Sequence, residues 1–224
     1  MPKYLLLFEK AESVRWLGHL DILRAFERAI RRAGLPIAFT NGFNPRERLA
    51  FASALSTGIT GKAEPALLEL VETAVPQNVL ERMNEALPPG IRIHDCAEIS
   101  EADAKDLIHS FDRAEYEVIC ACTEHLTAEQ MQTALEALLA QPQIEITRER
   151  EGRTRTADIR PFLFDLHLVP ESLGNARLSL RMAVSLGESG MARPSEIIAA
   201  LAQKLPGLSL RRAQRVRVFQ SLVK

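Results

Sequence analysis

The order of apolar patterns along the chain constrains its fold more than any other feature, because the same order occurs twice. Short apolar or alternating runs predict strands, and apolar residues spaced three to four apart predict helices. In the first half these patterns occupy residues 4–8, 19–33, 37–39, 49–52, 66–71, 77–86 and 91–93. In the second half they occupy residues 116–122, 127–140, 144–146, 162–168, 178–184, 194–205 and 216–219.

Each half begins with a strand and a helix, continues with strand candidates, and ends with a helix and a strand. We interpret this order as strand, helix, strand, strand, helix, strand, which is the split βαβ or ferredoxin-like arrangement. We therefore predict an α+β protein of two tandem ferredoxin-like units, each with an antiparallel sheet and helices on one face. The second half contains extra strand material. A polar segment at 100–113 joins the halves, so we predict an N-terminal domain at 1–105 and a C-terminal domain at 106–224.

The composition is that of a folded protein rather than a disordered one. Of 224 residues, 46% are hydrophobic and 25% are charged, which is ordinary for a globular chain. No apolar run is long enough to span a bilayer, and the apolar part of the segment 1–9 is too short for a secretory signal. We therefore expect a cytoplasmic protein with no membrane partner.

The three cysteines, Cys96, Cys120 and Cys122, fit neither a disulfide framework nor a zinc site, and we expect them to be small core residues. The chain also lacks a glycine-rich phosphate loop, a dinucleotide fingerprint, a zinc-spaced histidine pair, a nucleophile elbow and a cluster-binding cysteine set. These absences lower the support for the common enzyme classes. We expect this chain itself to bind no metal and no cofactor.

Charge is distributed unevenly, although the formal net charge is only -1. Segments 15–48 and 148–160 are mainly basic, whereas segment 64–112 is mainly acidic. A near-zero total argues against a protein that coats nucleic acid indiscriminately, but it permits local basic surfaces.

His19 and Asp21 lie at the start of the first predicted helix. Asp21 can stabilise the positive end of the helix dipole, and His19 can act as an acid or base near neutral pH. Both are therefore candidate catalytic residues. No activated nucleophile accompanies them, which favours a structural role: His19 would bond a neighbouring loop, and Asp21 would support the first turn.

Arg24, Arg28 and Arg31 follow at spacing i, i+4 and i+7, which places their guanidinium groups on one helix face. Such a face can clamp phosphates with forked donors. It can equally be a solvated surface, because Glu27 can pair with Arg31. The three arginines are candidate substrate-binding residues.

The loop Asn41-Gly42-Phe43-Asn44-Pro45 combines a flexible turn, an aromatic ring and a rigid proline. Asn41, Phe43 and Asn44 are therefore candidates for binding a base or another planar ligand. Phe43 could also fold back under the loop as an apolar plug, and the tendency of phenylalanine to be buried favours the plug. Arg46 follows the loop and adds positive charge, which favours an anion site at this end of the unit.

The charged segment 147–161 predicts a hairpin around Gly152. Its arginines could enter a nucleic-acid groove or contact phosphates, and they are Arg148, Arg150, Arg153, Arg155 and Arg160. The charge could instead protect an exposed sheet edge from pairing with another chain. Too few aromatic residues accompany the segment for an RNA-recognition motif, whose sheet needs interleaved stacking residues.

Five strings of residues resemble one protein family: FEK at 8–10, LGHLD at 17–21, RAFERAIRRAGLP at 24–36, GFNP at 42–45 and DIRP at 158–161. On these strings the chain is similar, over nearly its whole length, to the radical-SAM-linked protein family. Members are bacterial proteins encoded beside, or fused to, a radical S-adenosylmethionine (SAM) protein with a cobalamin-binding-like domain. One departure concerns the position after Asn-Pro, where members usually carry His-Pro and this chain has Arg46-Glu47. No role of that family histidine is carried over.

The resemblance implies a partner rather than a reaction. S-adenosylmethionine, an iron–sulfur cluster and cobalamin would be bound by the radical SAM partner, and this chain would recognise or position the substrate. Radical enzymes of this kind often modify RNA, and gene neighbourhood associates the family with ribonuclease functions. The resemblance therefore implies RNA, either tRNA or rRNA, as a second partner.

Three functions are compatible with these features. The first is a non-catalytic accessory or substrate-recognition protein that contacts RNA through its arginines on behalf of a radical SAM enzyme. The second is a stand-alone RNA-processing enzyme with His19 as acid or base, by analogy of fold with domains that process CRISPR RNA. The third is a pure protein-interaction module. We expect the first.

Overall fold

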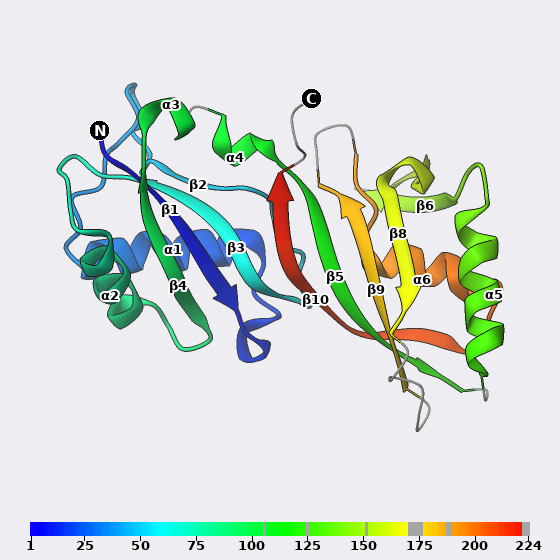
Figure 1. Cartoon of the computed structure of the whole chain (residues 1–224). Helices are drawn as coiled ribbons and strands as arrows, with labels where there is room; N and C mark the ends of the chain where they lie inside the picture. The colour runs from blue at the N-terminus through cyan, green and yellow to red at the C-terminus, as the bar shows by residue number, and fades with distance from the viewer. Residues whose placement is uncertain (105, 124–125, 151, 170–176, 187–189, 221–224) are drawn as a thin grey trace. The chain divides into compact units, whose positions relative to one another are not determined.

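The computed structural model describes residues 1–104, 106–123, 126–150, 152–169, 177–186 and 190–220 (Figure 1). The chain divides into two compact units. The first unit comprises Met1–Phe111 and the segment from Arg217 onward, and the second comprises Asp112–Val216.

The first unit contains an antiparallel sheet and two packed helices. Its strands are β1 (Lys3–Lys10), β2 (Leu49–Phe51), β3 (Ile59–Glu69) and β4 (Ile91–Ile99). Strand β1 pairs with β3 and with β4, and β2 pairs with β3, all in the antiparallel sense. Helix α1 (His19–Arg32) follows β1, and helix α2 (Pro76–Ala86) follows β3.

Both helices of the first unit share one core with alternate residues of β1. Successive strand residues point to opposite faces, so every second residue of β1 faces the helices. The shared cluster includes Tyr4, Leu6, Phe8, Ile22, Phe26, Ile30, Val79 and Met83. Phe26 is fully buried, and its ring packs edge-on against Phe8 and Phe51. Burying one such side chain contributes about 1.5–3 kcal/mol, which holds α1 on the sheet.

Helix α1 begins and ends at the signals that the sequence carries. The backbone N–H of Gly18 donates to Asp21 Oδ2 at 3.0 Å, and this bond closes the first turn. At the other end Gly34 has a φ of 60°, a left-handed conformation that favours glycine, and Pro36 follows it. The predicted helix at 19–33 is confirmed.

The second unit has the strand order β10-β5-β9-β8. These strands are β5 (Phe111–Cys122), β8 (Leu163–Leu168), β9 (Arg177–Ser185) and β10 (Leu208–Gln220). Strand β9 pairs antiparallel with both β5 and β8. Helix α5 (Ala128–Leu139) and helix α6 (Pro194–Ala202) contact each other, and α5 also contacts β8.

Shorter elements complete the chain. Strands β6 (Glu145–Arg150) and β7 (Arg153–Asp158) form a separate two-stranded ribbon between α5 and β8. Helices α3 (Glu101–Ala104) and α4 (Leu107–Ser110) occupy the polar segment before β5. The 3-10 turns are η1 (Glu12–Val14) and η2 (Arg160–Phe162). None of the described helices combines the length and apolar character needed to cross a bilayer.

The predicted α+β class with a mostly antiparallel sheet is confirmed. Three strand predictions were wrong in extent. Residues 37–39 form only isolated bridges, because Ile37 pairs with Leu70 and Phe39 with Glu47 in a loop. Strand β3 begins at Ile59, and its buried polar residues had interrupted the apolar pattern there. Strand β10 begins at Leu208 rather than at 216, because arginines break its alternation.

Cys120 and Cys122 are buried, as predicted for core residues, whereas Cys96 is only half-buried. Burial raises the pKa of the Cys120 thiol to about 12. Because the thiolate is the reactive form, this thiol is poorly reactive near neutral pH.

Candidate functional site

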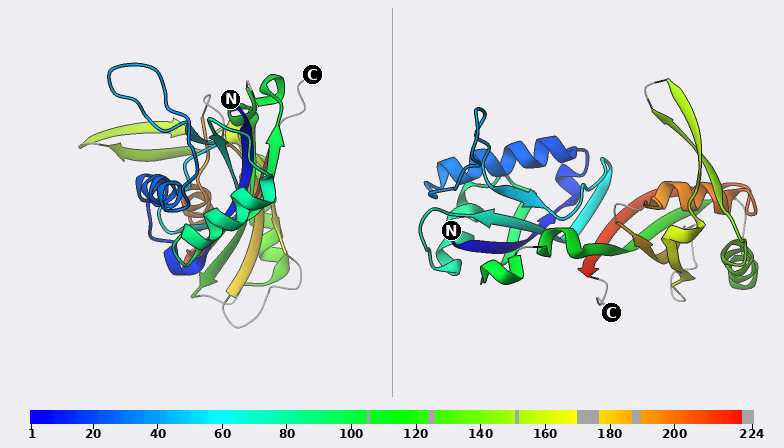
Figure 2. Two further views of the ribbon diagram at one scale, coloured as in Figure 1. Left: turned by 90° about the vertical axis from the view of Figure 1, so that its left-hand side faces the viewer. Right: turned by 90° about the horizontal axis from the view of Figure 1, so that it is seen from above.

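The β6–β7 ribbon aligns its arginines on one face. In the antiparallel register Arg148 lies opposite Arg155, and Arg150 lies opposite Arg153. Because residues alternate between the two faces of a strand, these four positions share one face of the ribbon. The opposite face carries Glu145, Thr147, Glu149, Thr154, Thr156 and Asp158. Figure 2 shows the ribbon extending away from the sheet of its own unit.

The ribbon confirms the predicted hairpin around Gly152, whose φ of 72° suits the tight turn. Arg153 and Arg155 are exposed along β7. Like charges placed directly opposite each other destabilise an antiparallel pair. A bound anion would relieve that repulsion, so this face is chemically suited to phosphate.

Arg148, in the middle of β6, is partly buried and bonds to groups of its own unit. Its Nε donates to Glu196 Oε1 at 2.7 Å, and its Nη2 donates to Glu196 Oε2 at 2.9 Å and to the Met191 carbonyl at 2.7 Å. Burial alone would raise the pKa of Glu196, but hydrogen bonds from Arg148 and from the Arg193 N–H outweigh it and lower that pKa. The hydrogen bond with Glu196 likewise raises the pKa of Arg148. Arg148 therefore anchors the ribbon to α6.

Arg160 also makes contacts within its unit. Its Nε donates to the Leu139 carbonyl at 3.0 Å, and its Nη1 donates to the Leu163 carbonyl at 2.8 Å. Asp158 Oδ1 accepts from the backbone N–H groups of Ile144 and Arg160 at 2.8 and 2.9 Å. These bonds fix the ribbon where it joins the rest of the unit. Arg153 and Arg155 are exposed and can be reached by a ligand, whereas the side chain of Arg150 lies outside the described part of the chain.

In the first unit, the arginines predicted to face a ligand lie on the outer side of α1. Arg24, Arg28 and Arg31 are exposed, as their spacing predicts. Arg31 Nε donates to Glu47 Oε1 at 3.1 Å, so it connects α1 to the end of the following loop. Among the described residues Arg31 pairs with Glu47 and not with the predicted partner Glu27, whose charge instead raises the pKa of Glu47.

The loop 41–45 is closed at its base and open at its tip. The Thr40 N–H donates to the Arg46 carbonyl at 2.8 Å, and the Arg46 N–H donates to Thr40 Oγ1 at 2.9 Å. Asn41, Phe43 and Asn44 are exposed, and Phe43 is fully so. The expectation that Phe43 plugs the loop was wrong, because its ring is fully exposed at the tip of a loop whose base is closed by hydrogen bonds.

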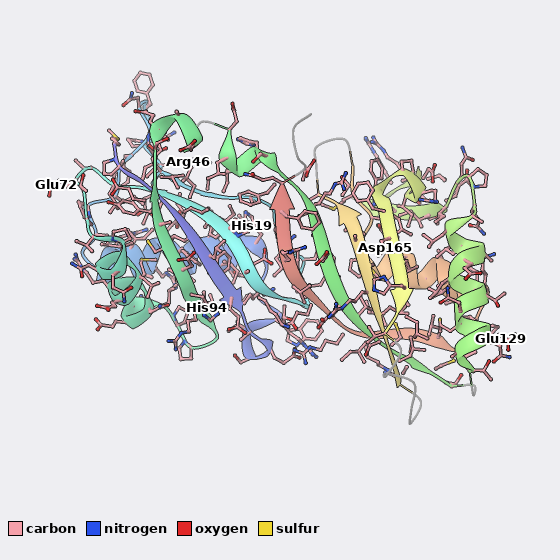
Figure 3. The ribbon with its side chains drawn as sticks, viewed as in Figure 1. His19, Arg46, Glu72, His94, Glu129 and Asp165 are labelled. Atoms are coloured by element: carbon pink, nitrogen blue, oxygen red, sulfur yellow. The ribbon has the colours of Figure 1, made fainter. Side chains whose placement is uncertain are left out.

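A groove of about 890 Å³ lies between α1 and the returning chain at 34–47. One wall consists of Leu23, Glu27 and Arg31, which are one turn apart on α1. The floor is segment 34–37, and the other wall is built from Phe39, Pro45, Arg46 and Glu47. Figure 3 marks Arg46 on this loop. The lining thus combines apolar surfaces with two guanidinium groups and two carboxylates.

Glu47 is the least satisfied polar group in this groove. Its side chain is only 9% exposed, and its Oε2 has no hydrogen-bond partner among the described residues. Burial raises the pKa of Glu47, while the charge of Arg31 opposes that change. A buried acceptor without a donor costs about 1–3 kcal/mol, so a ligand that donates here would be stabilised.

His19 and Asp21 occupy the start of α1, where Figure 3 marks His19. Asp21 closes the first turn, as the structural interpretation proposed. The His19 ring packs edge-on against Phe51 at 5.5 Å and lines a cavity of about 10 Å³ with Lys10 and Glu64. A space of that size holds roughly one water molecule, so it does not accommodate a nucleotide.

Several charged side chains that contact or lie beside the predicted site residues gave no signal in the sequence. Lys10 and Glu64 are buried beside His19, and Lys10 Nζ donates to the Leu17 carbonyl at 2.7 Å. Glu47 and Glu196 were missed because each contacts an arginine 16 or 48 positions away, beyond any helical or strand spacing. Among the described residues no cluster of three or more His, Cys, Asp or Glu side chains could hold a metal ion.

The chain belongs to a bacterial protein family, since the model of the family described as "Uncharacterized protein conserved in bacteria (DUF2344)" matches residues 3–194. No curated protein matches the sequence.

Solved structures share the fold at low sequence identity. A chain of the Cbf5-Nop10-Gar1 complex matches with a TM-score of 0.55 and 10% identity, covering 96% of this chain and 48% of that chain. An H/ACA RNP bound to a substrate RNA containing 2'-deoxyuridine matches with a TM-score of 0.53 and 10% identity, covering 96% and 47%. The archaeal box H/ACA sRNP Nop10-Cbf5 complex matches with a TM-score of 0.53 and 11% identity, covering 96% and 47%. This chain thus spans about half the length of the solved chains that it matches.

Proposed function

We propose that this member of the DUF2344 family is a non-catalytic, RNA-contacting protein that recognises substrate for another enzyme. The observation that carries the proposal is the arginine face of the β6–β7 ribbon. Arg153 and Arg155 are exposed there, while Arg148 and Arg160 hold the ribbon to the rest of its unit. Two of the solved structures of similar fold, an H/ACA RNP bound to a substrate RNA and an archaeal box H/ACA sRNP complex, support the same class of ligand.

The repulsion along the ribbon makes a polyanion the natural ligand. Arg148 is neutralised by Glu196, so the exposed positive charge is that of Arg155, which lies opposite Arg148, and of Arg153, nearer the turn. Phosphates spaced along a strand of nucleic acid can interact with successive arginines, and each neutralised phosphate releases counterions. Arginine also binds phosphate in a bidentate manner that lysine cannot match. The alternative role, protection of a sheet edge, explains the charge but not the gathering of all arginines on one face.

The enzyme that this chain would serve is a radical SAM protein, with tRNA or rRNA as the shared substrate. The resemblance in the strings at 17–21, 24–36 and 42–45 supports this partner. S-adenosylmethionine, the iron–sulfur cluster and cobalamin would then be held by the partner, and both proteins would act in the cytoplasm. Isolation of the chain from its native cell under crosslinking would recover the radical SAM protein together with RNA; recovery of neither contradicts this part of the proposal.

The proposed architecture is a pair of tandem ferredoxin-like units, with the domain boundary in the sequence between residues 105 and 106. What supports it is the strand order. In the first unit the order is β4-β1-β3-β2, and in the second it is β10-β5-β9-β8. If the four strands of each unit's sheet are numbered 1 to 4 in chain order, both sheets have the order 4-1-3-2.

Salt-dependent RNA binding tests the proposal. We expect the purified chain to bind a mixed tRNA fraction, with log K falling as log salt rises. Replacing both Arg153 and Arg155 with Ala should lower the affinity at least tenfold. Each lost phosphate contact reduces the slope of log K against log salt by roughly 0.7, so the two substitutions together should reduce it by about 1.4.

The matched control replaces Thr154 and Thr156 with Ala on the opposite face of the same strand. This variant should bind as the wild type does, since it leaves the arginine face intact. An affinity that changes neither with salt nor with the arginine substitutions would show that the ribbon does not contact RNA.

A further inference from the structure

The groove between α1 and segment 39–47 has the size and lining of a ligand site. Its volume of about 890 Å³ lies within the roughly 300–1,000 Å³ typical of small-molecule pockets. Such pockets are mostly apolar, with a few polar groups that orient the ligand. Here Phe39, which is 49% exposed, and Pro45 provide apolar surface, and Glu47 and Arg46 provide the polar groups.

We infer that this groove binds an unpaired guanine of the RNA, with the Glu47 carboxylate accepting hydrogen bonds from the N1–H and the N2 amino group of the base. The inference rests on the proposed function for its ligand class. It goes further by assigning a base-specific site to the first unit, whereas the ribbon contacts only phosphates.

The chemistry of Glu47 selects guanine among the four bases. An ionised carboxylate accepts hydrogen bonds and donates none. The Watson–Crick edge of guanine offers two adjacent N–H donors, which match the two oxygens of one carboxylate. Adenine and cytosine each place a ring acceptor beside their amino group, and uracil flanks its single N–H with carbonyl oxygens. Each of these three edges would set a lone pair against the carboxylate.

The unsatisfied state of Glu47 explains why a donor ligand would be bound. Oε2 has no partner among the described residues, and Oε1 accepts from Arg31 Nε, whose side chain is 66% exposed. Oε2 is enclosed, but the terminal torsion of a glutamate is soft, so rotation of the carboxylate can present both oxygens to a base in the groove. The exposed Arg46 guanidinium lies at the same wall, where it can contact the phosphate of the bound nucleotide.

The Phe39 ring supplies the remaining element of a base site. A half-exposed aromatic ring can stack against a base, a contact worth about 1–3 kcal/mol for any of the four bases. Stacking would therefore hold a base in the groove, and Glu47 would decide which base. This division accounts for a carboxylate in a basic region that otherwise favours phosphate.

Short oligonucleotides test the inference. Fluorescence anisotropy would compare ten-nucleotide uridine strands that carry a single central G, A or C with the all-uridine strand, using the full chain. A bidentate contact contributes about 1–3 kcal/mol of discrimination, so the G strand should bind about tenfold tighter or more. Glu47→Gln should abolish this preference and favour the A strand, because an amide offers one donor and one acceptor. Glu85→Gln, an exposed glutamate on α2, removes the same charge and should keep the preference for G.

Free guanosine monophosphate separates this inference from the proposed function. If the nucleotide perturbs the NMR signals of segment 34–47 and Glu47→Gln prevents it, the guanine site stands even if the chain binds no longer RNA. If RNA binds through the ribbon but the G strand has no advantage and Glu47→Gln changes nothing, the guanine site is wrong and the proposed function stands. Circular dichroism checks that each variant is folded. Glu47→Asp keeps a carboxylate on a shorter side chain, and it should retain part of the preference for the G strand.

Discussion

Each unit contains an arginine–glutamate pair, but the two glutamates differ in how many of their hydrogen bonds are made. The pairs are Arg148–Glu196 in the second unit and Arg31–Glu47 in the first. Glu196 accepts from Arg148 at both oxygens, at 2.7 and 2.9 Å, and from the Arg193 N–H. Glu47 accepts one bond from Arg31 at 3.1 Å and leaves Oε2 without a partner among the described residues. Accordingly the pKa of Glu196 is lowered and that of Glu47 is raised, although burial acts in the same direction on both.

This difference indicates a structural role for Glu196 and a ligand-binding role for Glu47. A buried carboxylate whose bonds are all made within the fold has little left to offer a ligand, and its role is to hold the ribbon on α6. A buried carboxylate with an unused oxygen reduces stability until a donor arrives. The unpaired oxygen of Glu47 is therefore the feature that indicates a ligand site in the groove.

Glu196→Ala should produce the largest effect, because it leaves Arg148 with a charge that the fold no longer compensates. Removing one partner of a buried pair costs about 3–5 kcal/mol, and the partial exposure of Arg148 reduces this to about 2–3 kcal/mol. For a chain of this length that corresponds to a fall in Tm of roughly 5–10 °C. Thermal unfolding followed by circular dichroism measures it.

Glu149→Ala is the control for that prediction. Glu149 is exposed on the opposite face of the ribbon, so its removal should change the free energy of unfolding by less than about 0.5 kcal/mol. Equal losses in the two variants would show that the contact between Arg148 and Glu196 is not what holds the ribbon.

Glu47→Gln should have a smaller effect of opposite sign. The raised pKa means that the folded protein holds this proton at a higher pH than the unfolded chain, so ionised Glu47 lowers stability above its folded pKa. That cost disappears as the pH falls toward the ordinary value of 4.5. We expect the variant to be more stable than the wild type at pH 7 by about 1 kcal/mol, the lower end of the cost of an unsatisfied buried acceptor.

Urea unfolding between pH 7 and pH 4 tests the sign. The advantage of Glu47→Gln should shrink as the pH falls through the raised pKa of Glu47. Glu196 behaves oppositely: its lowered pKa gives stability that is present above pH 4.5 and is lost only as the pH falls through that lower value. A variant that is less stable than the wild type at neutral pH would refute the interpretation of Glu47 as an unsatisfied group.

The sequence predicted one member of each pair and missed the other. Arg31 and Arg148 were found because helical spacing and a charged hairpin are local patterns. Glu47 and Glu196 were not found because their partners are distant in the chain, and only the fold brings them together. The same limit explains Lys10 and Glu64, whose burial beside His19 contradicts their ordinary preference for solvent.

Elements were predicted best where the pattern was strong. Helix α1 was found with its ends, because its apolar stripe, Asp21 and Gly34 agree. Strands β3 and β10 were found only in part, since buried polar residues break their alternation. Phe43 was misplaced because a general preference for burial says nothing about the hydrogen bonds that close this loop.

Arg31→Ala should have the smallest effect on stability and the most specific effect on Glu47. Because Arg31 is 66% exposed, its removal opens Glu47 Oε1 to water, which can take over the hydrogen bond, and the loss of the pair costs only about 0.5 kcal/mol. Its charge and hydrogen bond nevertheless lower the pKa of Glu47, so their removal should raise that pKa further. Carbon-13 NMR titration of the glutamate side-chain carboxyls measures the change.

Arg28→Ala, one turn earlier on the same exposed face, should leave the titration of Glu47 unaltered, since Arg28 is not among the groups that act on it. Equal shifts in both variants would mean that only the overall charge of α1 matters, and that Glu47 is not the partner of one arginine.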